Sequence, residues 1–329
     1  MKLWKKLSLL ALVLVAVSLT ACGGQEVSND SPQEGAGKSI KVGILQTAEH
    51  VALDHAREGF LEGLKEQGIE VEEQTVNGAG DLSVFPAAVN NFVSDEVDLI
   101  YAIGTPAAQA AMNGTQDIPV LFSAVTDPVK TRLVDNVDAP EGNVTGVSDY
   151  FPMDIQLKNF LEVFPETKTL GVLYSTGEAN SEVQIEILEE VVAELGITLE
   201  KVGVASTNEV PQAIESLTGK VDAYMGLSDN LASTSVSVIA KILEEKQIPS
   251  VATEGGPVEN GLLMSDGVDY VGQGKAAAEL AAEILDGKTI AELPVIFIEE
   301  GERTVNGKTA KALGVEDNEI LNKDANIVE

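Results

Sequence analysis

The stretch Ile100-Tyr-Ala-Ile-Gly-Thr-Pro-Ala-Ala-Gln109 predicts a buried strand that turns directly into a helix. Its apolar start has the length and composition of a strand buried on both faces. Gly104 permits a tight turn, Thr105 can cap a helix, and Pro106 suits the first helical position. The free N–H groups of such a helix start suit a carboxylate. Two interpretations stay open at this point: an anion site, or an ordinary strand–helix turn with nothing bound.

Short apolar strands and amphipathic helices alternate along the rest of the chain, beginning near Ser39. The alternation reaches Ser148 and restarts near Pro152, without an exact sequence repeat. Strands that are apolar throughout and joined by helices are typical of parallel sheets covered on both faces. We therefore expect an α/β fold with two doubly wound parallel-sheet lobes. A ligand would lie between the lobes, beyond the carboxyl ends of the strands.

The first 21 residues have the build of a secretory signal peptide. Three lysines precede an apolar run that is too short for a comfortable transmembrane span. The run ends in Leu19-Thr-Ala-Cys22, which resembles a bacterial lipobox and implies cleavage before Cys22 and lipidation of that residue. The alternative is an ordinary signal peptide with a chance cysteine. Residues 22–38 are polar and glycine-rich, which predicts a flexible tether. We expect an extracytoplasmic protein that meets the cell membrane only through its lipid anchor.

The composition excludes several classes of function. The chain has 21 Lys+Arg against 53 Asp+Glu, a net charge of −32. Such a surface repels nucleic acid, so we expect no nucleic-acid partner. His50 and His55 do not share a helical face, and the only cysteine is the anchor, so no metal site is expected. The sequence has no nucleophile elbow and no phosphate loop. We expect no catalytic residues and no cofactor, although an Asp/Glu dyad stays open.

Seven polar loops follow predicted strands and would meet at the ligand edge of the two sheets. Their hydroxyls, glycines and acids could hold a ligand that carries both a carboxylate and an ammonium group. Asp229 and Glu254 are the first candidates for the ammonium. The alternative is that the Asp and Asn residues only cap helices and form turns. The loops are Gln46–His50, Gly104–Pro106, Ala124–Pro128, Ser148–Tyr150, Ser175–Ser181, Leu227–Asn230 and Thr253–Pro257.

An ordered set of motifs resembles one protein family. From about Ser39 to the C-terminus, the chain resembles the substrate-binding lipoproteins of ABC transporters with the periplasmic binding protein type I fold. It is most similar to their tryptophan/tyrosine-type branch. Each motif is weak alone, whereas the ordered set is specific. The motifs are His50-Val-Ala-Leu-Asp54 with Arg57-x-Gly-Phe60, Gly104-Thr-Pro-Ala-Ala-Gln109, Phe122-Ser-Ala-Val-Thr-Asp-Pro128, Gly146-Val-Ser-Asp149, Glu178-Ala-Asn-Ser181 and Ser228-Asp-Asn230.

The resemblance implies two lobes that close on a ligand through a three-segment hinge. Lobe one would hold residues 39–149 plus 268–290, and lobe two 150–267 plus 291–329. Thr105 and the following backbone would bind the ligand carboxylate, and lobe two would contact the ligand from the other side. The candidate ligand-binding residues are Gln46, His50, Gly104, Thr105, Ala107, Thr126, Asp127, Asp149, Asn180, Ser181, Asp229 and Glu254.

The favoured function is a non-enzymatic receptor. A monomer would capture a small amino acid-like ligand, often an aromatic one, and deliver it to an ABC permease. One alternative is a surface-tethered ligand sensor that acts through a protein partner. A second is a cleft hydrolase, against which the lack of a nucleophile–base pair argues.

Overall fold

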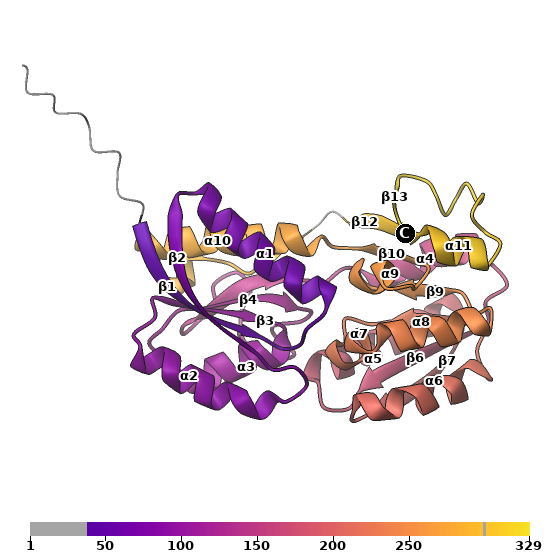
Figure 1. Cartoon of the computed structure of the whole chain (residues 1–329), viewed down its shortest axis with the longest axis horizontal. Coiled ribbons are helices and arrows are strands. Elements are labelled where there is room, and N and C mark those ends of the chain that lie inside the picture. Colours follow the sequence, from indigo (N-terminus) through magenta and orange to yellow (C-terminus); the bar gives the residue numbers. More distant parts are fainter. Residues whose placement is uncertain (1–37, 299–300) are drawn as a thin grey trace, which may run out of the picture. The chain divides into compact units, whose positions relative to one another are not determined.

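The structure is a computed structural model and describes residues 38–298 and 301–329. These residues form two sheets of mostly parallel strands, each covered by helices on both faces (Figure 1). The arrangement confirms the predicted fold class. The predicted signal peptide, the predicted lipidation site Cys22 and the tether up to residue 37 lie outside the described residues.

The first sheet has six strands, and all of its neighbouring pairs run parallel. The central strand Leu99–Ile103 is apolar throughout and fully buried, as expected for a sheet with two covered faces. In order across the sheet, the strands are β11 (Ile296–Phe297), β5 (Val144–Ser148), β4 (Val120–Val125), β3 (Leu99–Ile103), β1 (Lys38–Gln46) and β2 (Ile69–Asn77).

The second sheet has seven strands, and only the pair β10–β12 is antiparallel. The chain enters β12 after returning from the first sheet, and it then runs against its neighbour. In order across the sheet, the strands are β13 (Ala325–Val328), β12 (Glu302–Asn306), β10 (Met264–Gly267), β9 (Ser250–Ala252), β8 (Ala223–Gly226), β6 (Thr169–Ser175) and β7 (Thr198–Val204).

The helices divide between the faces of the two sheets. On the first sheet, one buried cluster joins the strands to α1 (Val51–Glu66) and α10 (Tyr270–Leu285), and another joins them to α2 (Phe85–Ser94) and α3 (Thr105–Gly114). The second sheet is covered by α4 (Met153–Val163), α5 (Ala179–Leu195) and α11 (Gly307–Ala312) on one face, and by α6 (Val210–Thr218), α7 (Asn230–Thr234), α8 (Val236–Glu245) and α9 (Gly256–Glu259) on the other. Short 3-10 turns occupy Leu82–Val84, Thr207–Glu209 and Ile290–Glu292. No helix in the described ranges is long and apolar enough to cross a membrane.

The stretch at Gly104 forms the predicted strand–turn–helix, with one difference at the cap. Gly104 has φ +93°, a conformation that favours glycine. Thr105 is the first helical residue, so its side chain does not cap the helix. Thr47 does so instead: its hydroxyl accepts the Ala107 N–H at 3.2 Å and donates to the Ile103 carbonyl at 2.9 Å.

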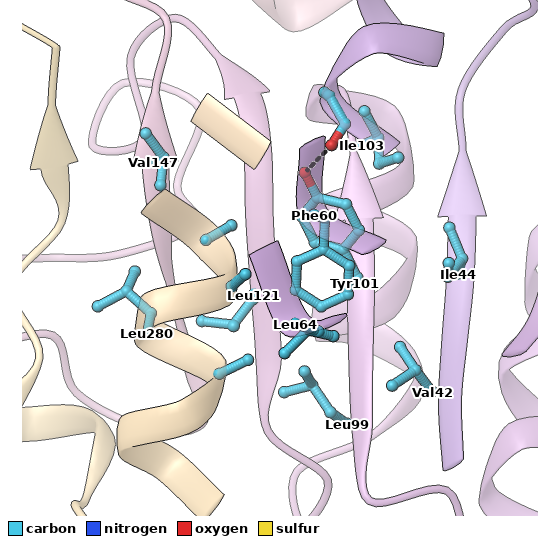
Figure 2. Close-up of a cluster of buried hydrophobic side chains, with 14 of the residues drawn as sticks. Val42, Ile44, Phe60, Leu64, Leu99, Tyr101, Ile103, Leu121, Val147 and Leu280 are labelled. Atoms are coloured by element: carbon cyan, nitrogen blue, oxygen red, sulfur yellow. Dashed lines mark hydrogen bonds between the residues drawn. The ribbon is translucent and has the colours of Figure 1, made fainter. Parts of the chain in front are cut away.

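Close packing of α1 against α10 fixes the start of α10, which carries a side chain of the candidate site. A Cβ at Gly274 would lie 2.2 Å from the Ala56 carbonyl oxygen, so only glycine permits this approach. Beneath the helices, Phe60 stacks on Tyr101 with ring centroids 4.0 Å apart, inside the cluster drawn in Figure 2. Such a dense core holds the strand ends in fixed positions.

The chain passes between the two sheets three times: after β5, after β10 and after β11. The third passage lies later in the chain than in the expected division, which assigned residues 291–329 to lobe two. Strand β11 pairs with β5 in the first sheet. Leu293 and Val295 are buried in the cores of that sheet, and the Val295 N–H donates to the Val137 carbonyl at 2.7 Å. Burial of these apolar side chains places the segment before the crossing rather than after it.

Candidate functional site

The carboxyl ends of strands from both sheets surround two cavities. The inner cavity is small, about 10 Å³. The outer cavity has a volume of about 490 Å³ and shares Asn230 with the inner one. The inner cavity is lined by His50, Leu53, Ala124, Asp149, Asn180, Ser228, Asp229, Asn230, Ser233, Glu254 and Tyr270. The outer cavity is lined by Thr47, Ala48, Ala79, Gly80, Asp81, Leu82, Ser175, Gly177, Glu178, Ala205, Ser206, Thr207, Asn230, Leu231 and Thr234.

Asp149 lies in the first passage between the sheets and faces the inner cavity. Its Oδ2 accepts the Tyr270 hydroxyl at 2.7 Å, whereas its Oδ1 is buried without a hydrogen-bond partner. Burial raises the pKa of the Asp149 carboxyl. Tyr270 starts α10 directly after the second passage, so this hydrogen bond also joins two of the three connections between the sheets. The hydrogen bond therefore ties the lining of the inner cavity to the connections between the two sheets.

Glu254 is the second acid of the inner cavity and is also fully enclosed. Its Oε2 accepts the Gly256 N–H at 2.7 Å at the start of α9. Burial, with a smaller contribution from the charge of Asp149, raises the pKa of Glu254 to about 8. Asn180 adds a further acceptor, because its Nδ2 donates to the Ser228 carbonyl at 2.9 Å while its Oδ1 is buried without a partner. Among the residues that the structure describes, no lysine or arginine lines either cavity, so no cation among them compensates these acids.

Asp229 also touches the inner cavity, but its hydrogen bonds are made within lobe two. Its Oδ2 accepts the Ser175 N–H and the Ser181 hydroxyl, both at 2.6 Å. Its Oδ1 accepts the Ala232 N–H at 2.8 Å and so caps α7. Both carboxyl oxygens therefore already have donors from the protein. This geometry fits the alternative that the sequence left open, a helix cap that also braces the strand end.

His50 and Asn230 meet between the two lobes. The His50 Nε2 lies 3.3 Å from the Asn230 Oδ1, and burial lowers the pKa of the imidazole, which favours its neutral form. Asn230 also donates from its side chain to Glu178 in the outer cavity. Burial first, and the nearby Asp229 second, raise the pKa of Glu178 to about 7. Asn230 thus forms part of the wall that separates the two cavities.

Seven of the predicted site residues line neither cavity. Gln46 donates to the Ala48 carbonyl and to Asp54, both at 2.8 Å, and Asp127 accepts the Val129 and Lys130 N–H groups in a turn. The other five are Gly104, Thr105, Ala107, Thr126 and Ser181, of which Ser181 donates its hydroxyl to Asp229 at 2.6 Å. The five that line the inner cavity are His50, Asp149, Asn180, Asp229 and Glu254.

The candidate list did not include Tyr270, Glu178, Ser228 and Asn230. The last three belong to the motifs Glu178-Ala-Asn-Ser181 and Ser228-Asp-Asn230, so the sequence carried a signal for them. Tyr270 follows a strand of the second sheet by only a few residues. Like Gly104, Tyr270 lies where a strand is followed by the start of a helix, and this position in the sequence could have indicated a site residue.

Comparison with known proteins identifies the family of this chain. Residues 41–329 match the family model described as ABC transporter substrate binding protein. The chain belongs to the ABC transporter substrate-binding protein family. It is 39% identical over 322 residues to a tyrosine-binding protein of Clostridioides difficile (strain R20291), an alignment that covers 95% of this chain and 93% of that protein.

Two solved structures of related proteins are similar to this substrate-binding protein in sequence and fold. A Streptococcus pneumonia ABC domain in complex with L-Trp has 32% identity and a TM-score of 0.83, with 89% of this chain and 100% of that chain covered. A ligand-free, open substrate-binding protein from Clostridium difficile has 39% identity but a TM-score of 0.68, with 88% and 99% covered. Together with further matches, these relatives establish the type I periplasmic binding fold. Proteins of this kind bind solutes outside the cytoplasm for an ABC transporter.

Proposed function

We propose that this substrate-binding protein captures a free aromatic amino acid between its lobes and delivers it to an ABC permease. The observation that carries the proposal is a set of hydrogen-bond acceptors in the inner cavity that lack donors. Asp149 Oδ1 and Asn180 Oδ1 are buried without partners, and Glu254 accepts only one backbone N–H. An ammonium group offers three N–H donors and one positive charge, which complement these acceptors.

The aromatic class is supported by the relatives and by the outer cavity. The Clostridioides protein is named for tyrosine, and the Streptococcus structure contains L-Trp. A volume of about 490 Å³ lies within the range of small-molecule sites. Apolar side chains of Ala48, Leu82 and Leu231 line it beside hydroxyl groups, a surface that suits a ring with a polar edge. The ring would extend from the inner cavity past Asn230 into this space.

Delivery to the permease would depend on lobe closure. Lobe one contributes Asp149 and Tyr270 to the inner cavity, while lobe two contributes Asn180 and Glu254. A ligand that bridges them favours the closed form by its differential affinity for that form. The permease would then recognise the closed surface.

Calorimetry with the mature protein tests the proposal. We expect saturable binding of L-tyrosine, L-tryptophan or L-phenylalanine, weaker binding of L-alanine, and no conversion of the bound amino acid over hours. The ratio of aromatic to alanine affinity measures the contribution of the ring. If none of the twenty amino acids gives heat or raises the melting temperature, the proposed ligand class is wrong.

We also propose that Cys22 carries a lipid that holds the protein at the outer face of the cell membrane. The support is the sequence Leu19-Thr-Ala-Cys22 at the end of the apolar run. Incorporation of labelled palmitate in cells is expected for the wild type and absent for Cys22→Ser, which should be released from the membrane fraction. Equal labelling of the two proteins would rule out Cys22 as the anchor.

A further inference from the structure

Asn230 lies where the two lobes meet and lines both the inner and the outer cavity. It is the first residue of α7, a helix that covers the second sheet, and its side chain reaches the strand ends of the first sheet. The His50 Nε2, in the loop between β1 and α1, lies 3.3 Å from the Asn230 Oδ1. A Cβ at Gly104, directly after β3, would lie 3.6 Å from the same oxygen. The Asn230 amide therefore packs against the ends of two strands of the opposite lobe.

The other partners of Asn230 determine which atom donates in its contact with His50. Glu178, just before α5, accepts the main-chain N–H of Asn230 at 3.3 Å and also its side-chain amide nitrogen. Because that nitrogen is directed at Glu178, the Oδ1 faces His50, and an amide oxygen can only accept. The His50 Nε2 must therefore carry a proton and donate it. Glu178 thus holds the Asn230 side chain on lobe two in the orientation that receives His50 from lobe one.

This contact lies beside the path that the proposed function gives to the ligand. With the ammonium in the inner cavity and the ring in the outer cavity, the ligand passes Asn230 between its charged end and its ring. A hydrogen bond whose two halves belong to different lobes forms only when the lobes approach each other. It therefore stabilises the closed form, and it must break before the lobes open and the ligand leaves.

From this geometry we infer that His50 and Asn230 form a clasp between the lobes that sets how long the ligand stays bound. They act as positioning residues: the clasp holds the lobes together over the ligand and does not distinguish one aromatic ring from another. Its effect falls on the rate of release rather than on the rate of capture, because the clasp closes after the ligand has entered. The inference rests on the proposed function, since it takes the ammonium in the inner cavity and the ring in the outer cavity as given.

A second contact joins the lobes at the surface and provides the matched control. The Lys130 Nζ, after β4, lies 3.4 Å from the Glu186 Oε2 on α5, and these side chains are 47% and 67% exposed. Solvent screens such an ion pair, so its contribution to closure is small. Neither residue lines the inner or the outer cavity. Lys130→Ala therefore removes a contact across the same gap without changing the candidate site.

Release kinetics of the mature protein test the inference. Without its predicted signal peptide the chain has no tryptophan, because its only one is Trp4, so stopped-flow fluorescence can follow bound L-tryptophan. Release of radiolabelled L-tyrosine on dilution gives the same rate for the second ligand. We expect His50→Ala and Asn230→Ala each to speed release about fivefold, the scale of one neutral hydrogen bond, with association changed by less than about twofold. The double variant should release no faster than the single variants, since both substitutions remove the same contact. His50→Gln keeps an N–H donor and should restore most of the slow release.

The outcomes separate this inference from the proposed function. If the wild type binds an aromatic amino acid and His50→Ala releases it at the same rate, the inference is overturned and the proposed function stands. This variant suffices even if Asn230→Ala does not fold, because the His50 side chain makes no other hydrogen bond among the described residues. Multiplied effects in the double variant, equal acceleration by Lys130→Ala, or different factors for L-tyrosine and L-tryptophan would each overturn the clasp. If the wild type binds no aromatic amino acid, the proposed function fails and the inference fails with it.

Discussion

Replacement of Asp149 by asparagine is expected to weaken binding of the amino acid by about 2 to 5 kcal/mol, the usual cost of removing one partner of a buried charge pair. The substitution keeps the shape of the side chain and an acceptor for the Tyr270 hydroxyl, which lies 2.7 Å away in the wild type. It removes the negative charge that we propose faces the ammonium, and it turns one acceptor into a donor. Calorimetry at constant pH gives the affinity, and denaturant unfolding checks that the protein remains folded.

Asp229→Asn is the matched control, because both aspartates are buried and both line the inner cavity. Asp229 accepts hydrogen bonds from three groups of the protein itself: the Ser175 N–H, the Ser181 hydroxyl and the Ala232 N–H. We expect this variant to lose about 1 to 3 kcal/mol of unfolding free energy, because the new amide nitrogen would face the N–H and hydroxyl donors that Oδ2 now accepts and would leave them without an acceptor. Its ligand affinity should change by only a few-fold. The opposite ranking, with affinity lost at Asp229 and kept at Asp149, would reassign the ammonium partner.

The stability of the ligand-free protein is expected to fall as the pH rises from about 4.5 to about 8. Burial raises the pKa of Glu254 from 4.5 to about 8, and the pKa values of Asp149, Asp229 and Glu178 are raised in the same direction. Between the unfolded and folded pKa values, the folded state holds more protons than the unfolded state, so unfolding free energy decreases with pH. The stabilisation is complete below the unfolded pKa and lost as the pH passes the folded pKa. Denaturant unfolding at several pH values measures this slope.

The same shift links ligand binding to proton release. Near pH 7 an ammonium that pairs with Glu254 favours its ionised form, so binding expels a proton and affinity rises with pH up to about 8. Calorimetry in buffers of different ionisation enthalpy counts the protons. Glu254→Gln should release fewer protons and show a shallower pH dependence of stability. Identical proton counts for the two proteins would show that Glu254 does not face the ammonium.

The sequence was sufficient for most of the fold because its strands are apolar on both faces. Leu99–Ile103 is fully buried and starts α3 through a glycine at positive φ, as its composition predicts. The capping of that helix could not be predicted, because the cap comes from Thr47 on a neighbouring strand end. Similarly, β11 pairs with β5 because Leu293 and Val295 are buried in the cores of the first sheet. The local sequence does not determine in which of the two sheets these side chains are buried.

The sequence predicted which loops form the candidate site, but it predicted only in part what each residue does there. Polar loops after strands predicted that Asp149, Asn180, Asp229 and Glu254 would come together, and they line one cavity. The difference between Asp149, with a buried oxygen that lacks a partner, and Asp229, with every oxygen occupied, depends on hydrogen bonds between distant segments. The sequence around an aspartate at a helix start does not show whether its carboxylate caps the helix or binds a ligand.

The most direct test of the central claim is a crystal structure of the mature protein with its bound aromatic amino acid. We expect the ammonium nitrogen to lie about 3 Å from Asp149 Oδ1 and from Asn180 Oδ1, the distance of an ordinary hydrogen bond, with Glu254 beside it and the ring directed toward the outer cavity. An ammonium bound elsewhere, or a ligand carboxylate facing Asp149, would contradict the account.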